Sequence, residues 1–124
     1  MQKVIVLLFF FSIILMGCNA KITEDDLIGG YWSVTSGYKD GKPYCKDFLS
    51  GGLEFKDKET VYGEEFNEDF KYKLEKRKHG LAIEFIRKDI HYSYYIDKIN
   101  KDEIGLIGVE GFQEDQSCYL KRND

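Results

Sequence analysis

Alternation of apolar and polar residues runs through most of the chain, and it constrains the fold more than any other feature. The alternating segments are 32–35, 53–56, 70–75, 81–85, 92–97, 104–106 and 118–120. A period of two is typical of strands that have one face in the core and the other in solvent. With a short strand at 60–62, we expect eight strands, and the polar links 57–59, 78–80 and 100–102 are typical of tight turns.

Eight consecutive strands predict an all-β domain, an eight-stranded antiparallel up-and-down barrel that closes on itself and leaves no sheet edge exposed. A β-sandwich has the same local pattern and is the alternative. The connections 38–50, 63–68, 87–90 and 110–116 are mostly longer than the three between them. In a meander these alternate loops lie at one end, which we call the mouth and expect to carry binding residues.

The N-terminal segment is far more apolar than the rest of the chain. Lys3 is the only charged residue before Lys21, and the run Val4–Met16 is interrupted only by Ser12. A basic start followed by ~7–15 apolar residues is typical of a signal peptide, whereas a membrane-spanning helix needs ~20. We therefore expect residues 1–17 to be a signal peptide.

The end of this run, Leu15-Met16-Gly17-Cys18, resembles the lipobox of bacterial lipoproteins. The resemblance implies that Cys18 carries lipid, that the chain is cleaved before it, and that the protein is anchored in the bacterial cell envelope. Asn19 in place of Asp favours the outer membrane by similarity to enterobacterial sorting. An ordinary secretory signal or an uncleaved anchor is the alternative.

Residues 18–28 are expected to form the lipidated tether and one helical turn, because Thr23-Glu24-Asp25-Asp26 fits a capping pattern. Removing the first 17 of 124 residues leaves 107, with 17 Lys and Arg against 22 Asp and Glu. This acidic balance argues against nucleic-acid binding. It also leaves Cys45 and Cys118, which in an oxidising compartment predict one disulfide. Two separate buried thiols are the alternative.

Gly30-Tyr31-Trp32, at the start of the first strand, resembles the G-x-W motif of lipocalins. The resemblance implies a lipocalin-like barrel over residues 29–122 in which Trp32 closes the end opposite the mouth. It further implies a basic partner from the last strand, Arg122 with Lys121 as the alternative. The second lipocalin motif, T-D-Y, is absent, since the chain reads Tyr95-Ile96-Asp97-Lys98 there.

Pairing of the first and last strands with Trp32 beside Arg122 places Ser36 near Cys118. Cys45 lies outside this register. For the predicted disulfide to form, the segment Tyr38–Tyr44 would have to fold back over the mouth.

The histidines show no catalytic signature. Neither His79 nor His91 has a Cys, Ser or carboxylate at a diagnostic spacing, and no His/Cys cluster predicts a zinc site. We therefore expect a protein that is not an enzyme and has no metal or cofactor.

Three tyrosines fall on the predicted inner face, namely Tyr72, Tyr92 and Tyr94. Each hydroxyl needs a partner or a wet cavity, so these residues predict a pocket for a small hydrophobic or amphipathic ligand. The alternative is that a barrel this small fills its interior with its own side chains.

Acidic residues gather in two of the mouth loops without neighbouring Lys or Arg in the sequence. We call them the acidic rim: Glu64, Glu65, Glu68, Glu110, Glu114 and Asp115. Such a rim could bind a basic protein, as envelope protein inhibitors and toxin-immunity lipoproteins do; solvated loops are the plainer interpretation. We expect a monomeric, non-catalytic binding protein held at the membrane by its lipid anchor. Its partner is a small hydrophobic ligand or, as the alternative, a basic protein.

Overall fold

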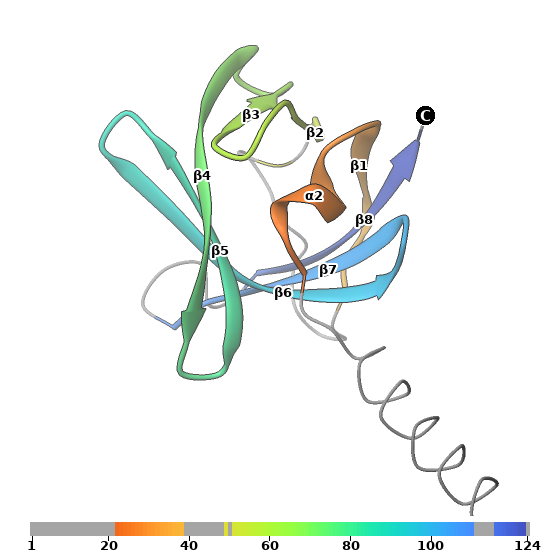
Figure 1. The fold of residues 1–124 in the computed structure, drawn as a ribbon, viewed down its shortest axis with the longest axis vertical. Coiled ribbons are helices and arrows are strands. Elements are labelled where there is room, and N and C mark those ends of the chain that lie inside the picture. Colours follow the sequence, from red (N-terminus) through yellow and green to blue (C-terminus); the bar gives the residue numbers. More distant parts are fainter. Residues whose placement is uncertain (1–21, 39–48, 50, 111–115, 124) are drawn as a thin grey trace, which may run out of the picture.

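The expected strands are all present in the computed structural model, which describes residues 22–38, 49, 51–110 and 116–123. They pair with their neighbours in chain order, and the first strand pairs with the last, so the sheet is a closed antiparallel barrel (Figure 1). The closure confirms the predicted fold and excludes the sandwich. The elements are α2 (Glu24–Leu27), β1 (Tyr31–Ser36), β2 (Leu53–Phe55), β3 (Thr60–Gly63), β4 (Glu68–Arg77), β5 (Gly80–Arg87), β6 (Ile90–Asn100), β7 (Glu103–Gly108) and β8 (Ser117–Asn123).

The seam between β1 and β8 has the expected register at one end only. Trp32 lies opposite Arg122, but the register shifts between Val34 and Ser36, and Ser36 then lies opposite Tyr119. The expected neighbour of Ser36 was Cys118, one residue away. A bulge is the physical reason, because an extra residue on one strand moves every later pair along by one.

Alternate residues of the strands form the core, as the sequence pattern predicts. Phe85 lies at its centre, fully buried, with its ring centroid 6.3–6.4 Å from those of Phe55, Phe70 and Tyr94. Tyr72 packs edge-on against Phe55 at 4.9 Å. The rings on the inner face therefore contact one another across the barrel.

A short helix covers the end of the barrel opposite the mouth. The Asp26 carboxylate accepts a hydrogen bond of 2.9 Å from the Thr23 amide, which is half of the predicted capping box. The indole N–H of Trp32 donates to the Leu27 carbonyl at 2.9 Å, and Ile28 forms a bridge with Phe55. These contacts hold α2 against the core.

The β4–β5 turn does not lie where we expected it. As one of the short connections, it was expected at the end of the barrel opposite the mouth. His79 in this turn lies 3.8 Å from Glu110, which follows β7 and was expected at the mouth. β5 pairs with β6 only from Ala82 onward, so the tip of the hairpin projects beyond its neighbour. The right-handed twist of the strands then carries the tip away from α2.

Candidate functional site

A charged pair lies on the inner face at the mouth, above the aromatic core. Arg87 continues the inward-facing series of β5, and its guanidinium donates to Glu68 at 3.0 Å. The guanidinium also stacks on Phe66, 3.7 Å from the ring centroid, and Phe66 packs against the core. The Arg87 side chain is 15% exposed, and its buried Nε–H has no hydrogen-bond partner among the described residues. An unpaired buried donor is costly, and an acceptor oxygen at this point would relieve that cost.

The predicted pocket tyrosines make different contacts in the fold. The Tyr72 hydroxyl donates to the Asp57 carbonyl at 2.8 Å, toward the α2 end, whereas the Tyr94 hydroxyl donates to Gln116 at 3.0 Å. Burial, and next the nearby charge of Glu24, raise the pKa of Tyr72, so its hydroxyl stays protonated. Tyr92 is half-buried and packs against the edge of the core.

The described members of the acidic rim have partners that the sequence did not show. Glu68 pairs with Arg87, Glu110 lies beside His79, and Glu64 accepts a hydrogen bond from the Tyr31 hydroxyl. Burial and then this hydrogen bond raise the pKa of Tyr31. The rim acids have no neighbouring Lys or Arg in the sequence, but in the fold Arg87, at the end of β5, pairs with Glu68.

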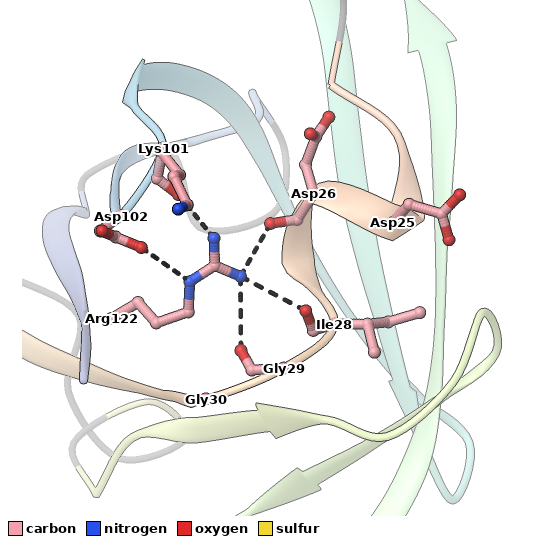
Figure 2. A pocket seen from close by; sticks show the side chains of 8 residues that line it. All are labelled: Asp25, Asp26, Ile28, Gly29, Gly30, Lys101, Asp102 and Arg122. Atoms are coloured by element: carbon pink, nitrogen blue, oxygen red, sulfur yellow. Dashed lines mark hydrogen bonds and ion pairs between the residues drawn. The ribbon is translucent and has the colours of Figure 1, made fainter. Parts of the chain in front are cut away.

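Arg122 lies at the other end of the barrel, over Trp32, as the G-x-W resemblance implies. The guanidinium carbon is 4.7 Å from the centre of the Trp32 ring. Nη1 donates to the carbonyls of Asp26, Ile28 and Gly29 at 3.0–3.4 Å, and Nη2 donates to the Lys101 carbonyl at 2.6 Å (Figure 2). Nε completes the set with Asp102 at 3.1 Å.

These residues line an open hollow of about 490 Å³ beside α2. Every nitrogen of Arg122 already donates to the protein, so the guanidinium holds α2, the Gly29-Gly30 link and the β6–β7 turn together. Gly30 is required there because an added Cβ would come within 2.8 Å of the Arg122 side chain and 2.7 Å of the Asn123 carbonyl. This arrangement is that of a structural clamp.

A third cluster, on the outer face of β4–β6, was missed in the sequence. Glu84 is 7% exposed although it faces outward, and His91 contacts it at 3.1 Å while Lys73 and Arg77 lie at 3.5 Å. Burial works to raise the Glu84 pKa, but His91 and Lys73 outweigh it and hold that pKa below its usual value. The register Lys73–Glu84–Ser93 across three strands is the signal that would have revealed the cluster.

The Glu84 cluster contains a serine, a histidine and a carboxylate, yet its geometry does not suit a nucleophile. Ser93 is fully buried, and both Ser93 and His91 bond to the same Glu84 oxygen. The serine hydroxyl thus donates to the carboxylate at 3.5 Å, whereas a histidine acting as general base would accept from that hydroxyl itself. Over the described part of the chain, no group of three His, Cys, Asp or Glu residues is placed to hold a metal ion.

Several predicted residues lie outside the described residues: Cys18, Cys45, Glu114 and Asp115. Cys118 is in β8 and fully buried. Among the described helices, none has the length and apolar character needed to cross a membrane.

Comparison of the chain with protein-family models, with curated proteins and with solved structures finds no match.

Proposed function

We propose that this protein is a non-catalytic bacterial envelope lipoprotein, anchored through Cys18, that binds a basic protein at the mouth of its barrel. The observation that carries the proposal is the packed interior. Phe85 packs against Phe70 and Tyr94 on the neighbouring strands β4 and β6 and against Phe55 on β2, and the hydroxyls of Tyr72 and Tyr94 are already hydrogen-bonded. A ligand in the middle of the barrel would have to displace these contacts, so recognition by the outer surface is favoured.

Charge at the mouth supports a basic partner. Glu65 is exposed, and Glu110 is 65% exposed with a half-exposed histidine at 3.8 Å beside it. An exposed contact of this kind contributes little, so the Glu110 carboxylate is available to a cation on another protein. The full chain carries a net charge of −4, which would favour encounter with a basic partner.

A second candidate is a small amphipathic ligand held at the mouth rather than deep in the barrel. It is favoured by the unsatisfied Nε–H of Arg87 beside half-buried Tyr92 and Phe66. Such a ligand would present an acceptor oxygen to Arg87 and rest its apolar part on the two rings.

We also propose that Cys118 pairs with Cys45. Two observations support the pairing: Cys118 is fully buried, and its sulfur is bonded rather than a titrating thiol. A lipocalin-like ancestry remains part of the proposal and is supported by Trp32 and Arg122, which meet as the G-x-W resemblance implies.

The test is purification of the native lipoprotein from its membrane, followed by mass spectrometry for bound lipid and bound protein. We expect a basic protein to copurify, and Glu65→Lys with Glu110→Lys to abolish its recovery. The matched control is Asp25→Lys with Glu59→Lys, which makes the same charge change at two exposed positions, in α2 and in the β2–β3 turn. Recovery of a small amphiphile alone would favour the second candidate, and equal loss of the protein in both variants would contradict binding at the mouth.

Metabolic labelling with radioactive palmitate tests the anchor. We expect label in the native chain and none in Cys18→Ala. Label that persists in the variant would contradict Cys18 as the lipid site.

A further inference from the structure

The tether between the proposed lipid and the barrel is very short. Ile22 is only 7% exposed and belongs to the core, immediately before α2. Four residue steps separate Ile22 from Cys18. Since each residue extends the chain by no more than ~3.6 Å, the backbone from Ile22 to Cys18 spans at most about 14 Å. A barrel on such a tether cannot move far from the lipid surface.

The tip of the β6–β7 hairpin lies next to α2 at this same end. Lys98 contacts Asp26 of α2 at 3.4 Å, and the Lys101 carbonyl is joined to Asp26 through the Arg122 guanidinium. Ile22 lies two residues before α2 and packs into the core, so the described end of the tether is at this end of the barrel. The tip and the end of the tether are therefore close.

The tip exposes an apolar side chain between two lysines. Ile99 is 42% exposed, and it lies in the bulge of β6 between Lys98 and Asn100, followed by exposed Lys101. The other large hydrophobic residue exposed among the described residues is Ile90, at 49% at the start of β6. An exposed isoleucine needs no explanation by itself, but here it sits within reach of a membrane.

We propose that the tip Lys98–Lys101 is a membrane-contact surface that lies on the lipid headgroups, so that the mouth points away from the membrane. Ile99 would enter the headgroup layer, and the flexible stems of Lys98 and Lys101 would bring their ammonium groups to lipid phosphates. The proposal rests on the proposed lipidation of Cys18.

The acidic residues of this end do not oppose the contact strongly. Asp26 faces Lys98, and Asp102 bonds to Arg122, so each has a cation at 3.1–3.4 Å. Asp25 also lines the hollow there. The surface is thus of mixed charge, and apolar insertion with phosphate contacts, rather than net positive charge, would hold it on the membrane.

The test is lysine footprinting on the lipidated chain added to vesicles of phosphatidylethanolamine and phosphatidylglycerol. The comparison variant has a Gly/Ser insert of about ten residues after Ala20, which lets the barrel leave the surface. We expect acetylation of Lys98 and Lys101 to be about fivefold slower with the native tether. Lys88, exposed in the β5–β6 turn at the mouth, serves as the internal reference and is expected not to change.

A second pair of variants separates insertion from simple crowding. Ile99→Asp should raise the reactivity of Lys98 and Lys101 on vesicles, whereas Ile90→Asp, at the other exposed isoleucine, should not. Equal reactivity with either tether, or equal effects of the two substitutions, would overturn the contact surface. Mass spectrometry of the N-terminal peptide in the same sample distinguishes the failures. An unlipidated Cys18 overturns the anchor and this inference together, whereas a lipidated Cys18 with unprotected lysines overturns this inference alone.

Discussion

Arg122 shows how much a single residue can organise in a small barrel. Its planar guanidinium reaches carbonyl groups in α2, the following link and the β6–β7 turn, and it covers the Trp32 ring. Only a forked, permanently charged group can meet acceptors in these several directions at once. The side chain is 12% exposed, so loss of its bonds would leave carbonyl groups poorly solvated.

We predict that Arg122→Lys lowers the free energy of unfolding by about 2–3 kcal/mol, because an ammonium group cannot reproduce the fork. Urea unfolding followed by Trp32 fluorescence measures the change at the site of the substitution. Lys121→Gln is the matched control, since Lys121 is an exposed neighbour on the same strand. If Arg122→Lys is no more destabilising than Lys121→Gln, the clamp is not what holds α2 in place.

At the scale of the elements, β4, β5 and β6 share one charged network on their outer face. Glu84 is its buried member, and Lys73, Arg77 and His91 reach it from three directions. The pKa of Glu84 is lower in the folded protein than its ordinary value of 4.5. A depressed pKa contributes stability above the unfolded pKa, and this stability is lost as the pH falls through the folded pKa.

We predict that Glu84→Gln destabilises the protein by about 1–2 kcal/mol at pH 7 and that the difference from the native chain shrinks below about pH 4.5. Thermal unfolding between pH 3 and pH 8 measures both effects. Glu75→Gln is the control, because Glu75 pairs with Lys73 and Arg77 but is 38% exposed. A pH-independent loss in Glu84→Gln would show that packing, not charge, is the cause.

The alternating pattern was sufficient to predict the strands, their order and most of the core, because a strand that is buried on one face has apolar residues at every second position. It could not predict the bulge before Ser36, which depends on how the closing strands meet. It also did not predict that Arg87 points inward. Arg87 follows the inward-facing residues of β5 at the same spacing of two, but it is charged, so the apolar pattern stops before it. The partners of the rim acids come from other loops, so spacing along the chain does not reveal them.

At the scale of the whole molecule, the proposed Cys45–Cys118 disulfide would close a long loop onto the last strand. Thiol counting of the folded, unreduced protein is predicted to find no free thiol at these two positions. Cys45→Ser with Cys118→Ala is predicted to cost about 4 kcal/mol by the chain-entropy argument, with a further loss from the buried position of Cys118. Two reactive thiols in the unreduced protein would exclude the bond.

The packing of the interior decides between the two candidate functions, and it can be measured at its centre. Phe85 is fully buried and touches three other rings, so Phe85→Ala should leave a cavity and cost about 3–5 kcal/mol in urea unfolding. Ile86→Ala, the next residue on the half-buried outer face, should cost less and serves as the control. A cost below about 1 kcal/mol for Phe85→Ala would mean that the side chains around Phe85 can rearrange at little cost in free energy. Such a barrel could admit an apolar ligand, and binding inside it would then replace recognition at the mouth as the better proposal.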